Sequence, residues 1–309
     1  KGVTVANAIQ TEGVITQSND FNSSLTGVIS GSGSVVKDGT GLLSITKDNS
    51  YSGGTDVNAG KVAIDADKAL GTGAATFAKD SELSLGISKG VTVANAIQTE
   101  GVITQSNDFN STLTGVISGS GSVVKDGTGL LSITKDNTYS GGTDVNAGKV
   151  AIDANAALGT GTATFAKDSE LSLGISKGVD VANTVQLDGA VKVHSSTFDS
   201  SLAVVSGSGS LVKDGTGILS LTQNNSYAGG TTIKEGTVAI DADVALGTGT
   251  ATFAQNTALS LGINQGVNVA NALQVDGAVK VHSNTFDSTL DGAISGVGSV
   301  VKDGVGSLT

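Results

Sequence analysis

The chain of 309 residues contains no Cys, Pro, Met or Trp, and its 17 basic residues are all Lys. The absence of Cys excludes disulfides and thiolate metal sites. Arg is the usual bidentate donor to phosphates and base edges, so its absence removes the best means of recognising nucleic acid. The net charge of −11 also repels polyanions. We therefore expect no nucleic-acid partner.

Aromatic residues are also scarce, at 3% of the chain, whereas hydrophobic residues make up 38% and Gly accounts for 45 positions. Few large side chains are available to fill a wide globular core. Alternating runs of Val, Ile, Leu and Ala nevertheless argue against disorder. No apolar run is long enough to cross a bilayer, so we expect no direct membrane insertion by this segment. A narrow core lined by small aliphatic side chains fits this composition best.

A repeat of 88 residues organises the chain. The segment 34–64 returns at 122–152 with one residue changed and, more diverged, at 210–240, and a further copy begins at Ser299. Repetition of this kind determines the fold before any single residue does. No linker separates the copies. We therefore predict one continuous β-helix fragment over residues 1–309, with sequence repeats 1–88, 89–176, 177–264 and 265–309, the last one partial.

Within each repeat the sequence predicts short strands. Hydrophobic residues alternate with polar or small ones, as at Leu83, Leu85 and Ile87, and Gly, Asn, Asp and Ser bound each run. Glycines at these boundaries can adopt the positive φ that a corner requires. Asp38-Gly39 could alternatively form a two-residue hairpin turn. Several such corners in each repeat favour the turns of a solenoid over hairpins.

Two all-β architectures suit a repeat of this size. The first is a right-handed parallel β-helix, a solenoid with three or four turns per repeat and a rise of roughly 4.8 Å per turn. The second is a series of tandem immunoglobulin-like β-sandwiches. A sandwich normally needs Trp, paired Cys or a corner Tyr in its core, and this chain has only three Tyr. The missing linkers also favour the β-helix.

Three motifs carry a family resemblance. They are Val36-Lys37-Asp38-Gly39-Thr40-Gly41, Asn49-Ser50-Tyr51-Ser52-Gly53-Gly54-Thr55 and Val57-Asn58-Ala59-Gly60. Together they resemble the autotransporter-associated β-strand repeat, and the match recurs in every copy over roughly half of its length. The resemblance is specific for the family and carries no information on activity.

The resemblance implies a passenger domain of a Gram-negative autotransporter adhesin, secreted by the type V route. Such a passenger lies on the bacterial cell surface, anchored by a C-terminal outer-membrane barrel that these 309 residues do not include. The implied function is cell–cell aggregation, biofilm formation or host-surface attachment through polar faces, with no catalysis. Its partners would be identical passengers or host surface molecules. The alternative is a structural stalk that projects a distal functional domain.

Repeated acidic residues are the first candidate site. Asp positions recur at the repeat spacing and could bind Ca²⁺ or a partner's Lys, but no complete calcium loop is present, so solvated positions and Asx turns are the simpler interpretation. These positions are Asp56 and Asp144, Asp65, Asp153 and Asp241, and Asp80 and Asp168. We predict no metal site and no cofactor.

Two further residue types recur. His194 and His282 occupy equivalent positions without an evident catalytic partner, so we interpret both as surface strand residues. Tyr51, Tyr139 and Tyr227 could be exposed and adhesive, but a place covering a corner of the core suits them better. No nucleophile elbow or phosphate-binding loop is present. We predict no catalytic residues and cannot assign binding residues.

Overall fold

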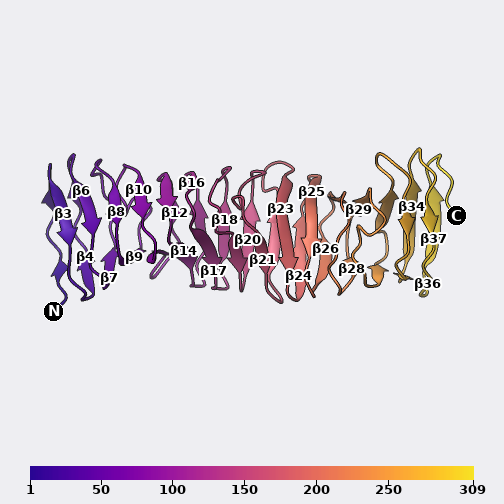
Figure 1. Ribbon diagram of the computed structural model, residues 1–309, viewed down its shortest axis with the longest axis horizontal. Helices are drawn as coiled ribbons and strands as arrows, with labels where there is room; N and C mark the ends of the chain where they lie inside the picture. The colour runs from indigo at the N-terminus through magenta and orange to yellow at the C-terminus, as the bar shows by residue number, and fades with distance from the viewer. The chain divides into compact units, whose positions relative to one another are not determined.

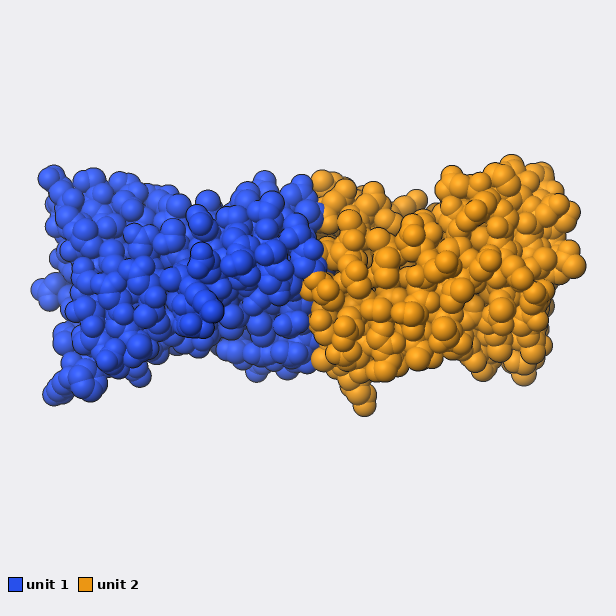
Figure 2. All heavy atoms as spheres, viewed as in Figure 1, with its two compact units in different colours: residues 1–150, 156–161 blue, residues 151–155, 162–309 orange.

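The computed structural model describes residues 1–309 as β-strands joined by turns, without a helix. No helix of a length and hydropathy suited to crossing a membrane is therefore found. The chain divides into two compact units, one of residues 1–150 and 156–161, the other of residues 151–155 and 162–309 (Figure 2). Each unit is described by itself. The continuity of the β-helix across all 309 residues stays a prediction.

In the first unit, successive turns of the chain stack their strands in three columns. Column I contains β1 (Thr4–Val5), β4 (Ser23–Leu25), β7 (Leu42–Ile45), β9 (Gly60–Ile64), β11 (Ser81–Leu85), β14 (Val102–Gln105), β17 (Ser122–Lys125) and β19 (Thr143–Val145). Column II contains β2 (Ile9–Gln10), β5 (Ile29–Ser30), segments at residues 50–52 and 70–72 that bond to the preceding turn through backbone groups, then β12 (Thr92–Val93), β15 (Ser111–Leu113) and β18 (Leu130–Ile133). Column III contains β3 (Val14–Gln17), β6 (Ser34–Lys37), β8 (Thr55–Val57), β10 (Ala75–Phe77), β13 (Ile97–Thr99) and β16 (Ile117–Ser118).

The second unit is built in the same way. One set of stacked strands is β22 (Glu170–Leu173), β24 (Ala190–Ser195), β26 (Ser210–Asp214), β28 (Thr231–Ile233), β30 (Ala251–Phe253), β33 (Leu273–Val275) and β36 (Ile294–Ser295). Another is β21 (Ala163–Phe165), β23 (Asp180–Leu187), β25 (Ser200–Ser206), β27 (Ile218–Leu221), β29 (Thr237–Ile240), β31 (Ala258–Leu261), β34 (Ala278–Ser283) and β37 (Ser299–Asp303). Two short strands, β32 (Asn268–Val269) and β35 (Thr289–Leu290), pair with each other, and β20 (Lys149–Ile152) contains residues of both units.

The strands form because inward and outward side chains alternate. In β7, Leu43 and Ile45 are buried, whereas Leu42 and Ser44 between them are partly exposed. Each fully buried aliphatic side chain contributes roughly 1.5–3 kcal/mol. Paired residues are parallel and lie 19 to 22 positions apart, as in Leu42↔Lys61 and Ala75↔Ile97. Figure 1 shows the resulting rows, for example β6, β8 and β10 in the first unit.

The all-β solenoid predicted from the sequence is confirmed, and the sandwich and hairpin alternatives are wrong. Both alternatives require antiparallel neighbours, whereas the strand pairs are parallel. The Asp38-Gly39 turn joins β6 to β7, yet these strands do not pair with each other. Instead β6 pairs with β3 and β8, and β7 pairs with β4 and β9. The turn is therefore a corner of the solenoid.

Candidate interaction surface

Several residues that recur in each copy of the internal repeat point into the core. The Asn49 side chain accepts a hydrogen bond from the Ile29 amide at 2.8 Å and donates to the Ala69 carbonyl at 2.8 Å. These two partners belong to the turns on either side of Asn49. Asn137 and Asn225 make the equivalent pairs of bonds. The Asn of the repeat therefore joins three turns and satisfies buried backbone groups.

The three tyrosines are also internal. Tyr51, Tyr139 and Tyr227 are fully buried, and each hydroxyl lies 2.5 to 2.6 Å from the Oγ1 atom of the Thr four residues later. This confirms that they pack in the core and rules out an exposed adhesive role. Burial raises the pKa of Tyr51 to about 12, although the bond with Thr55 opposes that shift.

The sequence analysis missed a buried lysine in each complete repeat. Lys37, Lys125 and Lys213 are fully buried, and each ammonium donates to carbonyl oxygens at a corner. Lys213 Nζ, for example, lies 2.5 Å from the Gly215 oxygen and 3.2 Å from the Glu235 oxygen. Burial lowers the pKa of Lys125 and Lys213 to about 8. The signal was available, because period-two alternation places Lys37 on the same face as the buried Val35.

The recurrent Asp residues divide into two groups. Asp65, Asp153 and Asp241 hold the loop of the next turn. Asp65 Oδ1 accepts bonds from the amides of Ile87 and Ser88 at 2.9 and 2.8 Å, and Oδ2 accepts from Ser88 Oγ. Burial raises the pKa of Asp65, but these bonds together outweigh it and hold the pKa below its usual value. Asp153 with Ser176, and Asp241 with Asn264, are arranged in the same way.

The other Asp positions are strand and turn residues. Asp56, an outward residue of β8, accepts a bond from Thr76 Oγ1 at 2.6 Å. Asp80 and Asp168 each adopt φ +64°, a left-handed conformation that Asp tolerates in turns. No group of three or more His, Cys, Asp or Glu residues is arranged to hold a metal ion. The geometry of these Asp residues is thus accounted for by hydrogen bonds inside the solenoid.

Charged side chains meet on the outward face at two points of the second unit. Lys192 Nζ lies 2.8 Å from Asp214 and 3.5 Å from Glu170. His194 is on the same strand, half-buried, in register with Ser172 and Asp214. In the next repeat, Asp303 lies 3.4 Å from Lys280 and 3.8 Å from His282. The two histidines thus accompany carboxylates on a charged strip, although the sequence suggested no partner for them.

Apolar side chains are exposed at the corners between columns. In the first unit, Val28, Ile87 and Phe109 are 46%, 46% and 42% exposed. In the second unit, Val204, Val244 and Phe286 are each 39% exposed. The remaining outward positions are mainly Ser, Thr, Asn and charged residues. The surface available for contact is therefore mainly polar, with exposed apolar residues in turns and in some strands, such as Val14 in β3 and Val204 in β25.

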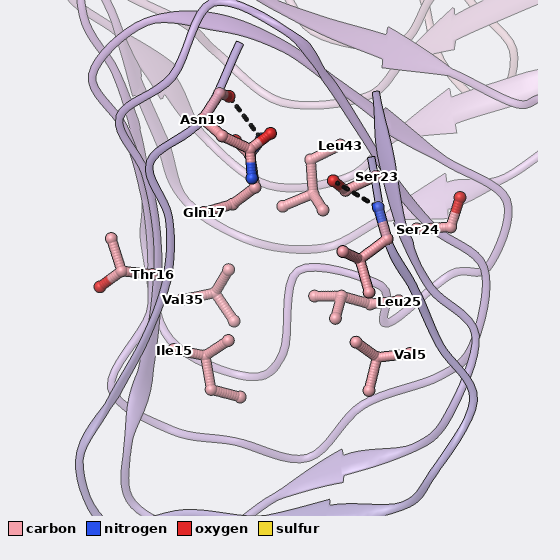
Figure 3. Close-up of a pocket in the computed structure, with 11 residues that line it drawn as sticks. Val5, Ile15, Thr16, Gln17, Asn19, Ser23, Ser24, Leu25, Val35 and Leu43 are labelled. Atoms are coloured by element: carbon pink, nitrogen blue, oxygen red, sulfur yellow. Dashed lines mark hydrogen bonds between the residues drawn. The ribbon is translucent and has the colours of Figure 1, made fainter. Parts of the chain in front are cut away.

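One cavity of about 220 Å³ opens among the first turns and is lined mainly by core-facing residues such as Val5, Ile15, Leu25, Val35 and Leu43 (Figure 3). No charged side chain lines it. Its residues are the same type of inward side chain that neighbouring turns cover elsewhere. Leu113, for example, is equivalent to Leu25 and is 1% exposed. We interpret this cavity as part of the core and not as a ligand site.

Comparison with known proteins connects this arrangement to a family. The model of the passenger-associated-transport repeat matches residues 35–64, 123–152 and 211–240. Each match begins in β6 or its equivalent and contains the buried Lys, Asn, Tyr and Thr described above. The matched segments therefore contain side chains that bind successive turns together.

A curated relative points in the same direction. The adhesin BmaC autotransporter of Brucella suis biovar 1 (strain 1330) is 32% identical over 159 residues, which are 50% of this chain and 4% of that protein. The chain therefore corresponds to a small part of that relative's length. No solved structure matches the chain. Passenger-associated-transport repeats and this relative together support an autotransporter passenger domain, exposed on the cell surface or outside the cell.

Proposed function

We propose that these passenger-associated-transport repeats form part of an adhesin that attaches bacteria to one another or to a host surface. The observation that supports this best is the separation of roles within each repeat. Residues that define the repeat are buried, so they build the scaffold, and the outward residues remain available for contact. The relative's printed name, an adhesin, favours the same role. We propose no catalysis: Ser172, His194 and Asp214 lie in register, but His194 Nδ1 has no hydrogen-bond partner, so no base is joined to a nucleophile there.

Contacts of such an adhesin would be numerous and individually weak. The outward faces offer hydroxyl, amide, carboxylate and ammonium groups, such as Thr76, Gln98 and Lys192. Exposed pairs of this kind are worth about 0–1 kcal/mol each and are screened by salt. Attachment therefore requires many of them acting together. Identical passengers or host surface molecules are the partners that we propose.

A stalk is the second candidate. Repeats 1–88 and 89–176 differ at only five positions, and their signature residues are internal. A spacer that projects a distal domain would need only such a scaffold and no binding residues of its own. This function predicts that the number of repeats changes reach but not attachment.

Surface display distinguishes the two functions. Bacteria that display residues 1–309 are compared with bacteria that display the same anchor alone, and settling and attachment to host-cell monolayers are measured at low and high salt. An adhesin accelerates settling or attachment, more strongly at low salt. Equal behaviour of both strains at every ionic strength would contradict adhesion. Deletion of residues 89–176 without loss of attachment would favour the stalk.

A surface variant and a matched control examine one exposed apolar residue. Phe109→Ser removes an exposed apolar side chain and should change the unfolding free energy by no more than about 0.5 kcal/mol, so any loss of attachment reflects contact. Thr128→Ser alters the next turn at the same corner while keeping the hydroxyl that bonds Asp108. That second variant should attach like the parent chain.

A further inference from the structure

At the boundary between the first two repeats, the strands do not stack on their sequence equivalents. β11 closes the first repeat and pairs with β14. The sequence of β14, Val-Ile-Thr-Gln, repeats that of β3. The equivalent of β1 in the second repeat is instead β12, which enters column II. Likewise β10 is followed in column III by β13, the equivalent of β2. At the boundary, each column therefore continues with a strand from a different position of the repeat.

The same exchange occurs at both boundaries in the second unit. β22, the equivalent of β11, pairs with β24, the equivalent of β14. β31 pairs with β34 in the same way. β21 and β30, the equivalents of β10, pair with β23 and β33. The exchange is thus a property of the repeat and not of one junction.

Turn length explains the exchange. Thr4, Ser24, Ser44, Ala63 and Ser84 lie one above another in column I, so Ser84 is four turns beyond Thr4. The sequence equivalent of Thr4 is Thr92, which comes eight residues after Ser84. Those eight residues turn one corner and begin the next side. Because the solenoid has three sides per turn, one repeat fills four turns and one side.

We infer that each 88-residue repeat presents its outward residues one third of a turn away from those of the preceding repeat. A partner that approaches from one side meets a given surface once in every three repeats. Adding one repeat adds a new direction of contact, and only a third repeat restores the original direction. The surfaces therefore suit separate partner molecules around the solenoid better than one partner lying along it. The consequence for attachment rests on the proposed adhesin function, whereas the rotation of each repeat by one third of a turn does not.

Disulfide cross-linking tests the arrangement, and the absence of natural Cys makes introduced pairs unambiguous. Neighbouring parallel strands are about 4.8 Å apart, which suits a disulfide. Glu82→Cys with Val102→Cys joins the register partners across the first boundary and should oxidise readily. Glu82→Cys with Thr92→Cys places the second cysteine in β12, the strand that would lie beside β11 if the second repeat began in the same column as the first. This pair should stay reduced. Oxidation of the second pair in preference to the first would overturn the inference.

Bivalent capture tests the presentation without a natural partner. A weak biotin analogue is attached at Thr16→Cys with Gln98→Cys, both outward in column III, or at Thr16→Cys with Thr104→Cys, which are equivalent residues on different sides. Both pairs are about four turns, or ~19 Å, apart along the solenoid. On a flat streptavidin layer the same-side pair should bind with both labels and dissociate at least about tenfold more slowly. Equal dissociation rates would overturn the inference, even if the chain proves not to be an adhesin.

Discussion

The hydroxyl of Tyr139 lies 2.6 Å from Oγ1 of Thr143, and both side chains are fully buried. Thr143 Oγ1 in turn donates to the Leu158 carbonyl at 3.2 Å, so the tyrosine hydroxyl donates to the threonine. This chain of two bonds recurs at Tyr51 and Tyr227. Polar groups of the signature motif thus satisfy one another inside an otherwise aliphatic core.

Removing the tyrosine hydroxyl and removing the threonine hydroxyl should lower the unfolding free energy by different amounts. Tyr139→Phe leaves Thr143 bonded to Leu158 and should lower the unfolding free energy by about 1 kcal/mol. Thr143→Val removes the donor to the Leu158 carbonyl and leaves the tyrosine hydroxyl only its longer bond of 3.4 Å to the Ala157 carbonyl. This variant should lose about 2 kcal/mol or more. Denaturant unfolding of the two variants measures the difference. A Thr143→Val variant as stable as Tyr139→Phe would contradict the proposed direction of the bonds.

The buried lysines predict that stability increases with pH in the mildly alkaline range. Burial lowers the pKa of Lys125 to about 8 from its usual value of 10.5. Between these values the Lys125 side chain is neutral in the folded chain, whereas it still binds the proton in the unfolded chain. Stability should therefore rise from about pH 8 towards pH 10. The unfolding free energy is measured at pH steps across this window.

Lys125→Met is the matched control for that experiment. The variant retains the apolar stem but has no titrating group, so its stability should rise less steeply with pH than that of the parent chain. The slope, and not the absolute stability, is compared, because the substitution also removes the donor to the Ala147 carbonyl. Identical slopes would show that the Lys125 ammonium does not lose its proton on folding.

Asp153 predicts loss of stability in acid. Burial raises the pKa of Asp153, but its bonds with Ser176 and with the amides of Ile175 and Lys177 together outweigh burial and hold the pKa below its usual value of 3.8. The contribution is therefore fully present above about pH 4 and is lost as the pH falls through the lower, folded pKa. Asp153→Asn should be destabilised at pH 7 by about 1–2 kcal/mol and should lose less on acidification.

Asp168→Asn provides the control for Asp153→Asn. Asp168 has φ +64°, and the equivalent residue of the next repeat is Asn256 with φ +61°. Because Asn already occupies this conformation in the same solenoid, the substitution should leave stability within about 0.5 kcal/mol. Thermal unfolding at pH 7 and pH 4 measures both variants. Equal losses for the two would argue against a specific role of the Asp153 loop.

Gly159 should be among the least replaceable residues. It has φ +71°, and an added Cβ would lie 2.4 Å from the Tyr139 carbonyl oxygen of the preceding turn. Gly159→Ala adds about 1–2 kcal/mol of left-handed strain to that clash. Gly13→Ala is the control, because a Cβ there would have no neighbour closer than 4.0 Å. Circular dichroism during thermal unfolding should show a lower midpoint for the first variant only.

Parts of the candidate surface could be predicted from the sequence, and parts could not. The tyrosines were correctly assigned to the core, because a large side chain in a narrow aliphatic interior gains most by burial. Lys37 was missed because a lysine is usually solvated, although its alternation with Val35 placed it inward. The carboxylate beside His194 was invisible in sequence, since Asp214 lies 20 residues away and is brought alongside only by the register of β24 with β26.

By itself, the sequence determined the fold class, the repeat of 88 residues and the acidic, cysteine-free surface, because these depend on period and composition. Only the tertiary structure decided how the repeat is divided into turns. Hydrogen bonds between turns and the glycine corners set the turn length. Four turns take the 80 residues from Thr4 to Ser84, so a whole number of turns does not fill the repeat of 88 residues. That mismatch decides which side each outward residue faces, and no local pattern encodes it.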